Sequence, residues 1–141
     1  MNSQIINHWP EMTGEKDLNK LLKAMRPIHN VGNFVFCTID TLTTELLNEA
    51  VYIFKEQEGI TVIIKKELAD DLGLGYSFVA SWITLTVHSS LEAVGFTATF
   101  TEAFTRHGIS CNVVAAYHHD HIFVHREDTE KALDILYELS V

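Results

Sequence analysis

The sequence predicts an α/β fold made of two similar halves. Segments rich in aromatic and β-branched residues, such as 33–39 and 78–88, alternate with segments whose apolar residues recur at helical spacing. Each half also contains a strand, a helix and then a Gly-Ile-polar exit, at Gly59-Ile60-Thr61 and at Gly108-Ile109-Ser110. This echo indicates an internal duplication. A chain of 141 residues can hold one domain or two very small domains packed together.

The first half is expected to contain two helices, two strands and a short helical turn. Residues 16–26 have helical apolar spacing, and Pro27 ends that helix. Residues 33–39 and 60–64 are the two strands, and residues 66–72 form the turn. Between the strands, Thr43 or Thr44 can cap a helix that runs to about residue 57. That helix would bury a stripe made of Leu46, Leu47, Ala50, Val51 and Phe54.

The second half begins with a long strand, residues 78–88. A loop then leads to a helix that ends at Gly108 and buries Phe96, Phe100, Ala103 and Phe104. Residues 109–117 and 122–125 flank the turn His118-His119-Asp120-His121 as a hairpin, and Asp128 can cap a last helix. A strand–helix–strand unit followed by a hairpin and a helix is ferredoxin-like. The predicted fold is therefore α/β (α+β), with antiparallel sheets and helices packed on one face.

The amino-acid composition excludes several classes of binding partner and location. The formal net charge is −9 and the longest run of basic residues is Lys65-Lys66, so nucleic acids and anionic membranes are unsuitable partners. No apolar stretch approaches the roughly 18 residues that a membrane span requires. Residues 1–12 lack the features of a secretory signal, and Cys37 and Cys111 lie in apolar runs typical of buried, reduced thiols. We therefore expect a cytoplasmic protein.

The run VGFTATFTEAF, followed by HGISCNVVAAY and DHIFV, resembles the ACT domains in order and spacing. ACT domains are small regulatory modules that bind amino acids. The chain is most similar to the stand-alone group that pairs two ACT-like lobes, and the resemblance extends from Gly14 to Leu139. It implies an N-terminal lobe at residues 14–76 and a C-terminal lobe at residues 77–141.

Two departures from the family pattern indicate that the lobes share strands. The chain ends directly after its last predicted helix, and residues 66–72 stand where a hairpin return is expected. Either the segment 78–88 closes the first sheet and opens the second, or the sheets pair between chains.

The loop from His88 to Gly95 has two interpretations. Ser89-Ser90-Leu91-Glu92 matches a capping box, in which Ser89 starts a helix and Glu92 bonds back to its N–H. Gly95 would then lie inside the helix at a cost of roughly 1 kcal/mol relative to Ala. Alternatively, Gly95 permits a ligand to approach the backbone closely.

The resemblance favours the ligand site, because ACT domains bind amino acids between this loop and the next strand, at an interface between lobes or subunits. Its expected contacts are Ser89, Ser90, Val94, Gly95 and Phe96 on the loop, with Cys111, Asn112 and Val113 on the strand. The N–H groups near Gly95 would hold the carboxylate, and Asn112 would meet the ammonium group or the side chain. Asp120 and His121 would support the site. Gly95→Ala is expected to leave the fold nearly intact and to weaken ligand binding.

The turn His118-His119-Asp120-His121 contains residue types that bind metal ions. Three histidines on one tight turn, however, cannot surround a tetrahedral ion. No matching Cys/His pair lies elsewhere, so neither a metal nor another cofactor is expected. A catalytic pair of Cys111 and His107 is disfavoured, because a buried thiol is inert. The sequence thus predicts a non-enzymatic regulatory protein that senses an amino acid and forms a homodimer or higher homo-oligomer. The alternative is a structural or partner-binding module without a ligand.

Overall fold

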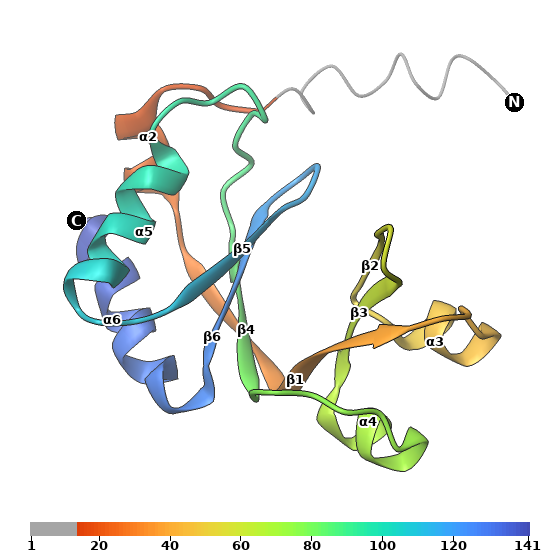
Figure 1. Ribbon diagram of the computed structural model, residues 1–141. Helices are drawn as coiled ribbons and strands as arrows, with labels where there is room; N and C mark the ends of the chain where they lie inside the picture. The colour runs from red at the N-terminus through yellow and green to blue at the C-terminus, as the bar shows by residue number, and fades with distance from the viewer. Residues whose placement is uncertain (1–13) are drawn as a thin grey trace, which may run out of the picture.

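The computed structural model describes residues 14–141 of the protein and contains one antiparallel sheet (Figure 1). The predicted absence of a secretory signal concerns residues 1–12 and lies outside the described part. Six strands lie side by side in the order β2-β3-β1-β4-β6-β5. Their bounds are β1 (Pro27–Ile39), β2 (Tyr52–Lys55), β3 (Ile60–Lys65), β4 (Ala80–Leu85), β5 (Cys111–Ala115) and β6 (Asp120–His125).

Side chains cap the first turns of α2 and α3, whereas α4, α5 and α6 begin without a side-chain cap, Asp128 before α6 included. The Asp17 side chain accepts a hydrogen bond from the Lys20 N–H, and Thr43 accepts one from the Leu46 N–H at 3.2 Å. Gly73, with φ of 67°, ends another helix in the left-handed conformation. The helices are α2 (Leu18–Ala24), α3 (Thr44–Glu49), α4 (Lys66–Leu72), α5 (Phe96–Arg106) and α6 (Thr129–Leu139), with a short 3-10 turn, η2 (Arg126–Asp128), before α6. None of the helices in residues 14–141 has the length and hydrophobicity that a membrane crossing requires.

The two halves complete each other's sheet through β1 and β4. β1 pairs with β3 from Phe34 to Ile39, and its first residues pair with β4, where Pro27 lies opposite Leu85. β4 also reaches the first half, because Ala80 lies opposite Phe34. The unit β1-α3-β2-β3-α4 thus gains β4 as its last strand, and β4-α5-β5-β6-α6 gains the start of β1. This confirms that the lobes share strands within one chain.

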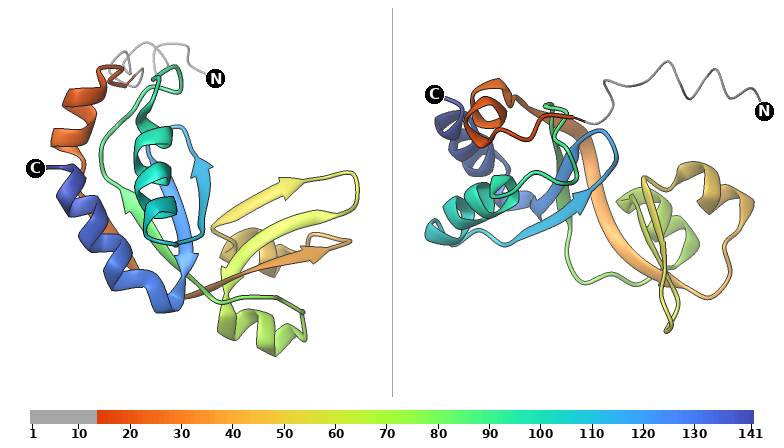
Figure 2. Two further views of the ribbon diagram at one scale, coloured as in Figure 1. Left: turned by 60° about the vertical axis from the view of Figure 1, so that its left-hand side comes forward. Right: turned by 90° about the horizontal axis from the view of Figure 1, so that it is seen from above.

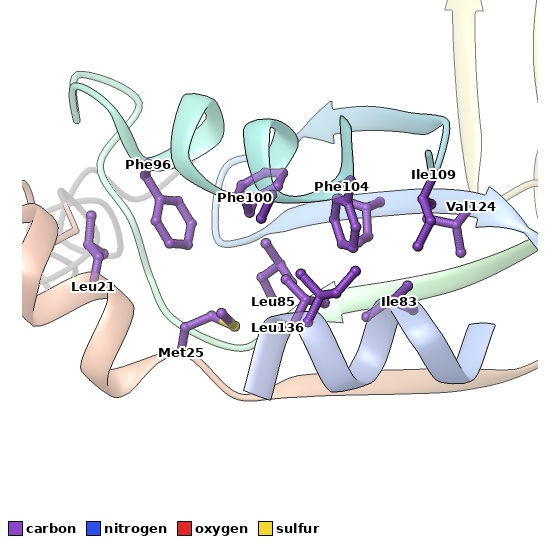
Figure 3. Close-up of a cluster of buried hydrophobic side chains, with 14 residues drawn as sticks. Leu21, Met25, Ile83, Leu85, Phe96, Phe100, Phe104, Ile109, Val124 and Leu136 are labelled. Carbon is purple, nitrogen blue, oxygen red and sulfur yellow. The ribbon is translucent and has the colours of Figure 1, made fainter. Parts of the chain in front are cut away.

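The helices cover one face of the sheet and form two cores there. In the larger core, α2, α5 and α6 pack on β4 and β6 (Figure 3). Leu21 of α2 and Met25, the residue that follows this helix, are fully buried there with Phe100, Phe104 and Leu136. In the smaller core, α3 and α4 pack on β1 and β3 around Val35, Val62 and Ile64. The predicted placement of all helices on one face is confirmed.

The opposite face carries no helix among the described residues. It carries an aromatic cluster to which both halves contribute, including Phe34, Phe36, Tyr52, Trp82 and Phe123. Strand twist curls the sheet about its central pair. As a result, the β2–β3 hairpin and the β5–β6 hairpin face each other across this side (Figures 1 and 2).

The prediction of one long helix from residue 43 to about residue 57 is wrong. α3 ends at Glu49, and β2 follows, with the Val51 N–H donating to the Ile63 carbonyl at 2.9 Å. The β-branched and aromatic run 51–54 favours a strand, and pairing with β3 decides for it. Most of the predicted buried stripe is consequently solvated: Leu47, Val51 and Phe54 are 56%, 40% and 54% exposed.

Three further expectations also need correction. Gly59 lies in the β2–β3 turn, whereas Gly108 follows α5, so the Gly-Ile echo does not mark equivalent positions. The hairpin return of the first half is β2–β3, and residues 66–72 are its second helix, α4. Asp120 and His121 belong to β6 and not to the turn before it.

The boundary between residues 76 and 77 stays a prediction. α2 precedes it in sequence but packs in one core with α5 and α6. The N-terminal segment therefore contributes to the stability of the C-terminal half.

This packing predicts that Leu21→Ala destabilises the protein by about 3 kcal/mol, as expected for a cavity at a fully buried leucine. Urea unfolding measures the change. Lys23→Ala, on an exposed position of the same helix, is the control and should cost less than about 0.5 kcal/mol. Equal effects of the two variants would mean that α2 is not part of the cooperative core.

Candidate functional site

The segment before α2 holds the loop 86–95, which joins β4 to α5. The Glu15 N–H donates to the His88 carbonyl at 2.9 Å, and the Ser90 N–H donates to the Glu15 carbonyl at 2.8 Å. Lys16 adds an ion pair with Glu92 at 2.8 Å. Gly14 allows this close approach, because a Cβ there would lie 2.6 Å from the Ser90 nitrogen. The loop is therefore fixed by a segment that is distant in sequence.

Gly95 is the N-cap residue of α5, with φ of 90°, and so does not lie inside the helix as the capping box would require. The capping-box interpretation is wrong. α5 begins at Phe96, and the Ser89 N–H donates to the Val87 carbonyl at 3.0 Å without starting a helix. The left-handed backbone at Gly95 is one that side chains with a Cβ rarely adopt, which explains why glycine stands there.

The start of α5 has the features of an anion site. Gly95 provides no side-chain cap, and the first helical hydrogen bond runs from the Thr99 N–H to the Gly95 carbonyl. The N–H groups of the residues from Phe96 to Ala98 precede that bond and point out of the helix end. Together with the helix dipole they favour a carboxylate or phosphate.

The side chains around this helix end have different environments. Ser89 and Ser90 are buried; the Ser89 hydroxyl donates to the Asp120 carboxylate at 3.3 Å, and the Ser90 Oγ accepts from the Glu92 N–H at 3.1 Å. Val94 is 84% exposed, whereas the Phe96 ring lies in the core. The loop thus offers backbone donors and serine oxygens, and Phe96 can contribute only its backbone.

The predicted strand residues Cys111, Asn112 and Val113 are the first three residues of β5, whereas the end of β5 is the part nearest the loop. Cys111 is opposite Val124 at the start of β5, whereas Ala115, at the end of β5, is opposite Asp120. Asp120 is the residue that touches the loop, through Ser89. One copy of the chain therefore brings together Ser89, Ser90, Val94, Gly95 and Phe96, with Asp120 beside them. It leaves Cys111, Asn112 and Val113 apart from this group.

His121 points to the helix-free face and not toward the loop. Its Nδ1 accepts a hydrogen bond from the Trp82 Nε1–H at 3.0 Å and lies 3.1 Å from the Thr84 hydroxyl. Burial, followed by the charge of His119, lowers the pKa of His121. Nδ1 is thus an acceptor, and the imidazole is held neutral.

Three further histidines, His88, His118 and His119, lie near the tip of the β5–β6 hairpin. The rings of His88 and His118 are 5.5 Å apart, and those of His118 and His119 are 6.3 Å apart. Within residues 14–141, no group of three or more His, Cys, Asp or Glu side chains is arranged to hold a metal ion. The cysteines are not activated, because burial raises the pKa of Cys37 and raises that of Cys111 to about 12.

Asp120 is a buried acid whose pKa is raised, first of all by burial, with the Ser89 hydrogen bond opposing that effect. A folded-state pKa above the unfolded value favours the protonated form. Its contribution to stability is present in acid and is lost as pH rises through the folded-state pKa. At pH 7 the ionised carboxylate therefore costs stability.

We predict that Asp120→Asn stabilises the protein at pH 7 by on the order of 1 kcal/mol, because it removes the buried charge and keeps an acceptor for Ser89. Thermal unfolding from pH 7 to pH 4 measures this gain, which should shrink toward the acid end. Asp134→Asn, on the exposed side of α6, is the control. A lower melting temperature for Asp120→Asn at pH 7 would show that the carboxylate is stabilised by its surroundings.

Comparison with known proteins identifies the family. Two family models, each described as an ACT domain, match residues 13–81 and 77–138. No curated protein matches the chain. A solved structure of a Vibrio cholerae protein of unknown function, described as a possible transport protein, shares 44% identity and a TM-score of 0.80. The similarity covers 89% of this chain and 98% of that one.

Two more distant structures share the fold. A protein from Agrobacterium tumefaciens has a TM-score of 0.68 at 14% identity, covering 82% of this chain and 89% of its own. The ligand-free regulatory subunit of aspartate kinase from Thermus thermophilus has a TM-score of 0.60 at 9% identity, with 84% and 97% covered. The matching family models describe a regulatory module and not a catalytic domain. The chain belongs to the ACT-domain family and carries two ACT domains in tandem.

Proposed function

We propose that the protein is a non-enzymatic sensor that binds an amino acid at the loop 86–95 and the start of α5. The single observation that carries this proposal is the helix end at Gly95, which has no side-chain cap and lies inside an ACT domain. Its backbone donors suit the carboxylate of an amino acid. The regulatory subunit of aspartate kinase, which shares the fold, supports a regulatory function.

The site needs a second copy of the chain under this proposal. Asn112 lies at the far end of β5 from the loop, so within one copy it cannot meet a ligand held at Gly95. A second copy that places its β5 edge against the loop would bring the two groups together. The exposed Leu91 and Val94 on the loop provide apolar surface for such a contact. We therefore propose a homodimer or higher oligomer in the cytoplasm, where binding shifts the balance between two packings.

A thermal-shift screen against the common amino acids tests the proposal. A ligand present at about 100 times its dissociation constant should stabilise the fold by about 2.7 kcal/mol. The same ligand should change the sedimentation coefficient if it acts through assembly. If no amino acid shifts the melting temperature and the protein co-purifies with a specific protein, the partner-binding function is correct instead.

Gly95→Ala should abolish most ligand binding, but φ of 90° means that it will also cost about 1–2 kcal/mol of stability. This revises the expectation that the fold stays nearly intact. Gly108→Ala is the matched control, because Gly108 follows the same helix with φ of 71° and has open space around its Cβ position. Both variants should lose similar stability in urea unfolding. Only Gly95→Ala should weaken binding by tenfold or more in calorimetry; equal binding by the two variants contradicts the site.

A further inference from the structure

The β2–β3 and β5–β6 hairpins face each other across the helix-free side (Figures 1 and 2), and residues of both line a cleft there. Its inner part is a hollow of about 110 Å³ between Tyr52, Trp82 and Phe123. Its outer part is a wider hollow of about 480 Å³ that includes Phe54 and Glu56. Tyr52 and Val114 line both hollows, so the two are adjacent. Both halves of the chain contribute walls to this cleft.

The inner hollow suits a small branched aliphatic group. The Trp82 and Phe123 rings stack with centroids 6.2 Å apart, and the Trp82 N–H is already used in its bond to His121. That bond leaves mainly apolar surface toward the hollow and keeps His121 uncharged. A cavity of about 150 Å³ lined by apolar side chains accepts benzene. A hollow of about 110 Å³ therefore accepts a smaller group, such as an isobutyl group.

The outer hollow suits a positive charge. Tyr52 and Phe54 stack there with centroids 6.1 Å apart, and Phe54 is 54% exposed despite its size. The Glu56 carboxylate accepts a hydrogen bond from the Thr61 hydroxyl, which positions it at the same end of the cleft. Among the described residues, neither lysine nor arginine lines either hollow. Aromatic faces and one carboxylate without a basic partner attract an ammonium group.

We propose that this cleft binds a small organic ammonium ion with a short branched aliphatic tail. The tail occupies the hollow beside Trp82, and the ammonium group lies between Tyr52, Phe54 and Glu56. A ligand that also carries a carboxylate would bring that group toward Glu56 with no basic side chain to receive it. The cleft therefore discriminates against amino acids. Within one copy of the chain it lies apart from the loop 86–95, and Cys111, Asn112 and Val113 line its outer hollow.

The test uses the full-length, ¹⁵N-labelled protein and three probes with the same tail. The probes are 3-methylbutylammonium, the neutral 3-methylbutan-1-ol and the anionic 4-methylpentanoate. The Trp82 indole N–H reports on the inner hollow, and the Trp9→Phe variant assigns its signal, since the chain has two tryptophans. The ammonium ion should shift this signal with a dissociation constant at least fivefold lower than that of the alcohol. The carboxylate should bind more weakly than both.

Glu56→Gln should weaken binding of the ammonium ion about fivefold, as expected for a partly exposed charge pair. The same variant should bind the alcohol as strongly as the unaltered protein does. Glu58→Gln is the matched control, because it removes the same charge from the same turn outside the cleft lining. Phe54→Leu should weaken binding of the ammonium ion by a smaller factor. Gly95→Ala should leave binding of the ammonium ion unchanged, so this proposal and the loop site can fail separately.

Three results would overturn the proposal. The first is that the ammonium ion at about ten millimolar does not shift the Trp82 signal. This result overturns the proposal also when its cause is a second copy of the chain that fills the cleft. The second is equal binding of the ammonium ion and the alcohol. The third is equal weakening by Glu56→Gln and Glu58→Gln, which would show that only the net charge of the protein matters.

Discussion

The pairing of β1 with β4 holds the two ACT domains in one structure. Without it, each half would retain only three strands and lose the neighbour that covers its first strand. Phe34 and Ala80 lie opposite each other at the crossing point and belong to the same cluster on the helix-free face. Side chains alternate along both strands. The pairing has a register shift between Asn30 and Phe34, and on both sides of it the helices lie on one face of the sheet and the aromatic cluster on the other.

The same pairing determines where the two proposed sites lie. β4 carries Trp82 on the helix-free face and ends at Leu85, directly before the loop 86–95. Curling of the sheet about β1 and β4 turns the outer hairpins toward each other and creates the cleft. Because neither half can form its own complete sheet, neither half contains the whole cleft. The loop, by contrast, is built by the second ACT domain together with the segment around Glu15.

Local patterns were sufficient for the helices that cover the larger core. The apolar spacing in α2 and α5, together with Pro27 and Gly108, predicted both elements and their ends. The run 51–54 was different, because its apolar residues fit a helical period as well as a strand. Only pairing with β3, which follows in the chain, decides between them. The chemistry predicted for the loop also depended on distant contacts, since Glu15 and Asp120 determine what Ser89 and Ser90 can bond.

The loop 86–95 and the cleft are connected by β4, which carries Trp82, and by the β5–β6 hairpin. Ile83 and Leu85 of β4 are fully buried in the larger core, and so are Ile122 and Val124 of β6, so neither strand can shift without unpacking that core. The β5–β6 hairpin touches both places: the Asp120 carboxylate at the start of β6 accepts a hydrogen bond from Ser89, and Val114 on β5 lines the cleft. If a ligand at one proposed site moved this hairpin, it would change the affinity at the other. Thermodynamic linkage requires that effect to be equal in both directions.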